Sequence, residues 1–120
     1  MEALIVDDVL FTRLIVEEAL HVAELRKNIK FFSIEHADSL KTAMEKIKQR
    51  KFKLVITDIK LKDGLGIELA KHIKSINPET IVIALTMYPV EFEKNRETFD
   101  EFIKKPISPK ELELKLEKFL

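Results

Sequence analysis

Residues 54–66 read LVITDIKLKDGLG and contain the strongest fold signal in the chain. The run at 54–57 is short, apolar and rich in β-branched residues, which is typical of a buried strand. It ends on a carboxylate, Asp58, and a lysine-rich turn with two glycines follows. We therefore ask which other residues meet Asp58 at the edge of a sheet.

Similar apolar runs alternate with helical patterns along the rest of the chain. We expect strands at 3–6, 31–34, 54–57, 81–85 and a less regular one at 101–104. Such alternation predicts an α/β fold, a doubly wound parallel sheet with helices on both faces. For five strands the common order is 2-1-3-4-5, with ligands bound at the carboxyl ends of strands 1 and 3.

Helices are predicted between these strands. Apolar residues recur at helical spacing after the first strand, as on the apolar face of a helix: Phe11, Leu14, Ile15, Ala19, Val22 and Leu25. Asp38 or Ser39 can cap a second helix, residues 67–76 form a third, and Ser108 with Glu111 forms a capping box for the last. The segment MYPVEFEKNRETFDEF, 87–102, is short, and we expect a clipped or tilted helix there.

Composition limits the class of protein. The 120 residues fit one domain, with 46% hydrophobic and 35% charged residues. Lys+Arg and Asp+Glu both number 21, so net charge does not call for nucleic acid or a membrane surface. The sequence has no cysteine and no signal or membrane-spanning pattern, and we expect a cytoplasmic protein.

Polar residues stand where the predicted strands end. Asp7 and Asp8 follow the first strand, Asp58 the third, Thr86 the fourth and Lys105 the fifth. Carboxylates packed this closely repel one another, so at least one should hold its proton unless cations are present. A divalent ion is one such cation, and oxygen ligands without sulfur or imidazole suit Mg²⁺. With Lys105 and Thr86 nearby, the pocket is suited to a phosphoryl group, for which Asp58 is the best candidate nucleophile.

Four motifs in order resemble those of response-regulator receiver domains: LIVDD at 4–8, DIKLKDGLGIEL at 58–69, ALT at 84–86 and FIKKP at 102–106. The resemblance covers nearly the whole chain and includes the single-domain chemotaxis regulator. It implies a flavodoxin-like three-layer sandwich and one receiver domain over 1–120, with no output domain in this chain.

The resemblance also implies roles for single residues. Asp58 matches the phosphoacceptor, Asp8 the main metal carboxylate and Asp7 its neighbour. The backbone carbonyl of Lys60 would be a further metal ligand. The remaining matches are the switch hydroxyl Thr86, the switch aromatic Phe102, the site lysine Lys105 and a cis bond from Lys105 to Pro106.

The implied function is signalling rather than enzymatic turnover. A sensor histidine kinase or phosphotransfer protein would supply a phosphoryl group to Asp58 with Mg²⁺. The change would alter binding of a downstream protein target through helix 4, strand 5 and helix 5. The resemblance implies no direct contact with nucleic acid or membrane, and either a monomer or a phosphorylation-dependent dimer.

Several positions depart from the family pattern. Lys62 replaces a usual proline, Lys60 occupies a rate-tuning position, and Met87 replaces a small residue after Thr86. We expect Met87 to shield the phosphoryl group and slow autodephosphorylation.

Alternatives remain beside this interpretation. Asp7 and Asp8 could cap a helix, Lys105 could be a surface lysine, and Phe102 could be ordinary core. At the level of function, one alternative is a receiver-like interaction module that is never phosphorylated. Another is a metal-dependent phosphatase, against which Lys60 stands where such enzymes carry a second aspartate.

Overall fold

A computed structural model of the chain describes residues 2–31, 33–87, 92–106 and 108–120. The main sheet contains β1 (Glu2–Val6), β2 (Ser33–Ala37), β3 (Leu54–Asp58), β6 (Ile81–Thr86) and β7 (Glu101–Lys104). A small hairpin is formed by β4 (Lys60–Leu61) and β5 (Gly64–Leu65). The helices are α1 (Leu10–Lys27), α2 (Leu40–Gln49), α3 (Gly66–Ile76) and α4 (Pro109–Glu117), with a 3₁₀ helix η1 (Glu93–Thr98).

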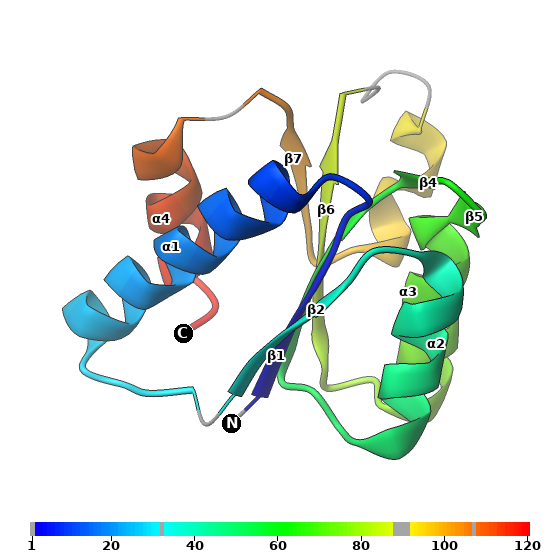
Figure 1. Ribbon diagram of the computed structural model, residues 1–120, viewed down its shortest axis with the longest axis horizontal. Helices are drawn as coiled ribbons and strands as arrows, with labels where there is room; N and C mark the ends of the chain where they lie inside the picture. The colour runs from blue at the N-terminus through cyan, green and yellow to red at the C-terminus, as the bar shows by residue number, and fades with distance from the viewer. Residues whose placement is uncertain (1, 32, 88–91, 107) are drawn as a thin grey trace.

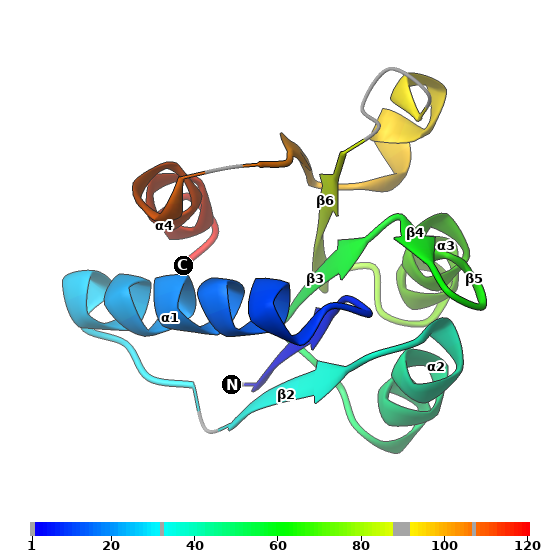
Figure 2. The same ribbon diagram turned by 45° about the horizontal axis from the view of Figure 1, so that its top comes forward.

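The main sheet has the order β2-β1-β3-β6-β7, and every pair of neighbours is parallel. This confirms the predicted order 2-1-3-4-5, since β6 and β7 are the fourth and fifth strands of that sheet. Helices α1 and α4 cover one face, and α2 and α3 cover the other (Figures 1 and 2). The carboxyl ends of β1 and β3 therefore lie side by side at one edge of a three-layer sandwich.

The core divides into two layers because side chains alternate along each strand. In β1, Ala3 and Ile5 pack with Leu20 and the rest of the α1–α4 layer, whereas Leu4 and Val6 face α2 and α3. All four β1 side chains are at most 1% exposed. A strand buried on both faces explains the continuous apolar runs in the sequence.

Side-chain caps begin two of the helices as predicted. Ser39 Oγ accepts a hydrogen bond from Thr42 N–H at 3.1 Å, and Ser108 Oγ accepts one from Glu111 N–H at 3.1 Å. Pro109 occupies the first turn of α4, where the missing N–H would have no helical partner. These caps fix where α2 and α4 start relative to the strand ends.

Two expectations about the first half of the chain are wrong. The second strand is Ser33–Ala37 rather than 31–34, because pairing with β1 sets its register, from Glu2 opposite Ser33 to Val6 opposite Ala37. The apolar face assigned to α1 is wrong in part: Ala19 is buried and Ile15 packs against the core, but Phe11, Leu14 and Leu25 are 72%, 49% and 83% exposed. The helix instead packs through a narrower set of buried residues, Val16, Ala19, Leu20 and Ala23.

The segment after β6 is short, as expected from the sequence. Within the described part of residues 87–102, the helix between β6 and β7 is η1, a six-residue 3₁₀ helix over Glu93–Thr98. Residues 88–91 lie outside the described residues. The β4–β5 hairpin after Asp58 was not predicted. None of the helices in the described ranges has the length and apolarity needed to span a bilayer.

Candidate functional site

Three carboxylates meet at the carboxyl ends of β1 and β3. Asp7, Asp8 and Asp58 each place an oxygen within 4.8 Å of the others. The register of the two strands, with Val6 opposite Thr57, brings the residues that follow them into contact. The structure therefore brings together the acidic residues that the sequence placed at one edge of the sheet.

Asp7 is the most firmly held of the three. It is 2% exposed, and its N–H donates to Ala37 O at 3.1 Å. Its Oδ1 accepts from Val9 N–H at 2.9 Å, so Asp7 closes the turn into α1. The N-cap position of α1 is Val9, which makes no side-chain cap. The alternative that Asp7 only caps this helix therefore accounts for just one of its contacts. Asp8 is exposed at the rim of the cluster.

Lys105 joins two of the carboxylates. Its Nζ donates to Asp7 Oδ2 at 2.7 Å and to Asp58 Oδ2 at 3.2 Å, and only 15% of its side chain is exposed. Burial alone would lower the pKa of the ammonium, but the hydrogen bond to Asp7 and the charges of both carboxylates outweigh it and raise the pKa. The site therefore favours the charged form of Lys105, and its burial and two contacts distinguish it from a surface lysine. The bond from Lys105 to Pro106 is cis, as the resemblance implied.

The surroundings of Asp58 raise the pKa of its carboxyl group. Burial raises its pKa most, the nearby charge of Asp7 raises it further, and Lys105 opposes both. An added cation near this carboxylate would favour its charged form. The donor set of three carboxylates without imidazole or sulfur fits a hard divalent ion such as Mg²⁺.

The loop after Asp58 is tightly packed. A Cβ on Gly66 would lie 2.2 Å from the backbone oxygen of Asp58, so only glycine allows α3 to begin so close to the end of β3. Gly66 N–H donates to Ile59 O at 2.7 Å. At the tip of the hairpin, Asp63 accepts from the N–H groups of Leu40 at 2.7 Å and Lys41 at 2.9 Å. The loop is thereby tied to the start of α2, a link that sequence reasoning missed.

The side chain of Lys60 contacts an aromatic ring. Its Nζ lies over the ring of Phe92 at 6.0 Å from the ring centre, a cation–π contact between β4 and the residue before η1. Lys60 is otherwise exposed.

Of the two expected switch residues, Thr86 ends β6 and Phe102 lies within β7. Thr86 is fully buried at the end of β6, and its carbonyl accepts from Lys105 N–H at 2.7 Å. Phe102 is 6% exposed, edge-on to Phe99 at 6.1 Å and beneath the Arg96 guanidinium at 4.8 Å. Met87 follows Thr86 and is 62% exposed.

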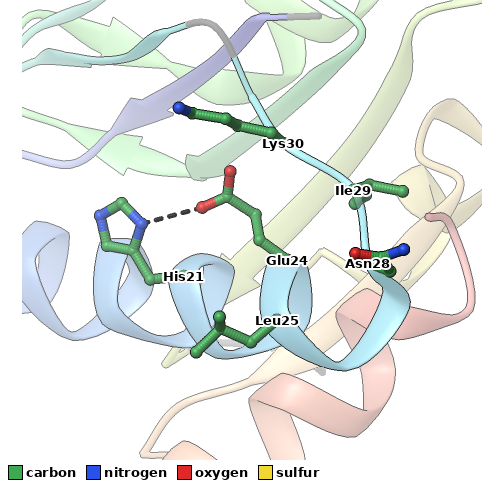
Figure 3. A pocket seen from close by; sticks show the side chains of 6 residues that line it. All are labelled: His21, Glu24, Leu25, Asn28, Ile29 and Lys30. Carbon is green, nitrogen blue, oxygen red and sulfur yellow. Dashed lines mark hydrogen bonds and ion pairs between the residues drawn. The ribbon is translucent and has the colours of Figure 1, made fainter.

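A hollow of about 620 Å³ at the far end of α1 is unrelated to this chemistry (Figure 3). It lies roughly 20 Å along the helix from the acidic cluster, at 1.5 Å per residue. Glu24 points toward His21 there and accepts from its Nδ1 at 2.9 Å and from Phe31 N–H at 2.6 Å. The polar groups are thus satisfied by one another, and the hydrogen bond to Glu24, opposed by partial burial, raises the pKa of His21.

Comparison with known proteins supports the resemblance. The response regulator receiver domain family matches residues 3–117. The response regulator protein PilR of Pseudomonas aeruginosa is 33% identical over 87 residues, which are 72% of this chain and 18% of that protein. The chain thus spans less than a fifth of the length of this curated relative.

Solved structures share the fold. Chemotaxis response regulator CheY4 of Vibrio cholerae superposes with a TM-score of 0.82 at 23% identity, covering 99% of this chain and 98% of the other. Response regulator TrrA from Thermotoga maritima, solved with Mg²⁺ and a beryllium fluoride group, gives a TM-score of 0.74 at 28% identity and covers the same shares, 99% and 98%.

Proposed function

The chain belongs to the response-regulator receiver domain family, and we propose that it is a phosphorylation-activated switch of two-component signalling. Asp58 accepts the phosphoryl group from a histidine of a sensor kinase or phosphotransfer protein. The observation that carries this proposal is the ammonium of Lys105, 2.7 Å from Asp7 and 3.2 Å from Asp58, beside the exposed Asp8. A fixed cation beside a partly desolvated carboxylate is the arrangement that phosphoryl transfer needs.

The transfer requires little covalent chemistry from the protein. A carboxylate oxygen of Asp58 bonds to phosphorus while the phosphorus–nitrogen bond of phosphohistidine breaks, and the electron pair leaves with the imidazole. Mg²⁺, held by Asp8, Asp58, the Lys60 carbonyl and through water by Asp7, would neutralise the phosphoryl oxygens when bound. Lys105 contributes a second cation, and Asp7 keeps that cation in place.

Signal output follows from the ends of β6 and β7. The phosphoryl group recruits the Thr86 hydroxyl, and Phe102, next to η1, changes its packing in response. Both states exist before phosphorylation, and the modification shifts their populations. The affected face comprises η1, β7 and α4, which we propose as the contact for a downstream protein or a second copy of the chain. Residues 1–120 act in this proposal as one receiver domain.

Intact mass measurement after incubation with acetyl phosphate tests the proposal. The mass of one phosphoryl group should be gained in the presence of Mg²⁺ and not with EDTA, because the carboxylates repel an unneutralised phosphoryl donor. Asp58→Asn is the control and should gain nothing. A folded, Mg²⁺-binding protein that stays unmodified would instead support an interaction module that is never phosphorylated.

A further inference from the structure

Arg13 makes two hydrogen bonds that link three segments of the chain. Its Nη1 donates to the backbone carbonyl of Asp7 at 2.7 Å, and its Nε donates to His36 Nδ1 at 3.2 Å. Arg13 lies in α1, Asp7 in the turn after β1, and His36 in β2. Arg13 lies outside the sequence motifs described above.

The carbonyl that Arg13 holds belongs to the peptide bond between Asp7 and Asp8. A peptide unit is planar, so a fixed carbonyl also fixes the direction in which the chain enters Asp8. Asp7 has its own anchors at Ala37, Val9 and Lys105, whereas Asp8 is exposed at the rim of the cluster. Arg13 therefore acts mainly on the orientation of Asp8.

The guanidinium is itself held in place. Because Nε of arginine always carries a proton, His36 Nδ1 must accept, and the imidazole proton of this neutral ring is assigned to Nε2. His36 Nε2 lies 2.6 Å from Glu17 Oε1, so the ring donates to that carboxylate. Glu17 is one helical turn after Arg13 on α1 and returns the link to the same helix. This arrangement limits the rotamers that Arg13 can adopt.

We propose that Arg13 is a positioning residue for the divalent-ion site, holding the Asp7–Asp8 peptide so that the Asp8 carboxylate points into the cluster before the ion arrives. The inference rests on the proposed function for the identity of the ion. Partners that orient metal ligands without touching the metal strongly influence affinity, and their loss typically costs 10–100-fold. The expected consequence of losing Arg13 is weaker ion binding with the chemistry at saturating ion preserved.

Isothermal titration with Mg²⁺ on the unphosphorylated chain tests this directly. Arg13→Met should raise the Kd for Mg²⁺ about tenfold relative to wild type. Arg26→Met is the matched control: it removes an arginine of the same helix whose partners, Glu113 at 3.5 Å and Glu117 at 3.6 Å, lie on α4 far from the turn. The control has the same change of charge and should keep the wild-type Kd within about twofold.

A second measurement separates positioning from general damage. The rate of labelling by acetyl phosphate should reach nearly the wild-type plateau in Arg13→Met, but at about tenfold higher Mg²⁺. His36→Phe removes only the brace behind Arg13 and should shift the Kd in the same direction by a smaller factor, more than about twofold. If Arg13→Met does not fold, His36→Phe decides the question.

The outcomes distinguish this inference from the proposed function. Wild-type affinity for Mg²⁺ in a folded Arg13→Met, or in His36→Phe where that variant must decide, would overturn the positioning role and leave the phosphorylation proposal intact. A lower plateau rate with an unchanged Kd would also overturn it. If the wild-type chain itself bound no Mg²⁺, the ion-dependent function would fail and the positioning role with it.

Discussion

Replacing Lys105 with methionine should destabilise the protein through the two carboxylates that it now neutralises. The side chain keeps a similar length and apolar stem, so the change removes mainly the charge. At an effective dielectric constant near 20, distances of 2.7 Å to Asp7 and 3.2 Å to Asp58 correspond to attractions of about 6 and 5 kcal/mol. The cost of burying the ammonium offsets much of this.

Removing one partner from a buried ion pair leaves the other charge uncompensated and typically costs about 3–5 kcal/mol. We expect about 3 kcal/mol, the lower end of this range, for Lys105→Met at neutral pH without Mg²⁺, because the Asp58 side chain is still 14% exposed. That loss corresponds to a fall in Tm of roughly 10 °C for a domain of this size.

The loss should depend on pH. Burial already raises the pKa of Asp58, and without Lys105 the pKa rises further. A carboxyl whose pKa is higher in the folded state binds protons preferentially there, so stability increases as pH falls through the folded pKa. The deficit of Lys105→Met should therefore be largest at pH 7 and shrink by pH 5.

Urea unfolding at both pH values, with and without Mg²⁺, measures these effects. Lys118→Met is the matched control, since Lys118 pairs with Glu101 at 2.8 Å but is 58% exposed, and should cost less than about 1 kcal/mol. In an Asp58→Asn background, Lys105→Met should cost at least about 1 kcal/mol less, the coupling expected of contacting residues. Equal costs in both backgrounds, or a deficit independent of pH, would refute the electrostatic account.

Three further changes test other parts of the site. Gly66→Ala forces a Cβ to within 2.2 Å of the Asp58 carbonyl oxygen. Urea unfolding should show a free energy of unfolding lower by about 2 kcal/mol, and Asp58 should be labelled more slowly. An unchanged free energy of unfolding would disprove the close packing. Asp63→Ala removes the acceptor for two N–H groups of α2. Hydrogen bonds from Lys41 and Leu40 lower the pKa of Asp63, so the stabilising effect of Asp63 should be present above the usual carboxyl range and disappear as pH falls through the lowered pKa. A loss of stability in Asp63→Ala that is equally large in acid would contradict this. Met87→Ala should shorten the lifetime of the acyl phosphate, which is measured by intact mass after the donor is removed. An unchanged lifetime would mean that the exposed Met87 does not shield the phosphoryl group.

The sheet and the acidic cluster could be predicted because they depend on local patterns. Runs such as 54–57 identify buried strands, and parallel strands must present their carboxyl ends at one edge. The second strand could not be placed by the same means, since its register comes from pairing with β1 along Ser33–Ala37. Phe31 has strong strand propensity, yet it precedes the strand and lies buried in the preceding loop.

Other parts of the site depend on contacts between segments distant in sequence. Arg13 is 23 residues from His36, and Asp63 is 23 residues from Leu40. A lone arginine among 21 basic residues forms no motif. The group of Asp7 that Arg13 binds is a backbone carbonyl, which carries no sequence information. Asp63 precedes a glycine, which indicates a turn but not the helix that the turn would cap.

The same geometry explains how a charge change at Asp58 can reach the strands that we propose for output. Lys105 is held more closely by Asp7, at 2.7 Å, than by Asp58, at 3.2 Å, so phosphoryl oxygens can share the ammonium without displacing it. Its backbone N–H donates to the Thr86 carbonyl at 2.7 Å, and this bond joins the ends of β6 and β7. If either residue shifts toward a phosphoryl group, as we propose, we expect this bond to couple the movement of the two strand ends. Phe102 lies three residues before Lys105 along β7, packed under Arg96 of η1. We therefore expect such a movement to change the packing of Phe102 against η1.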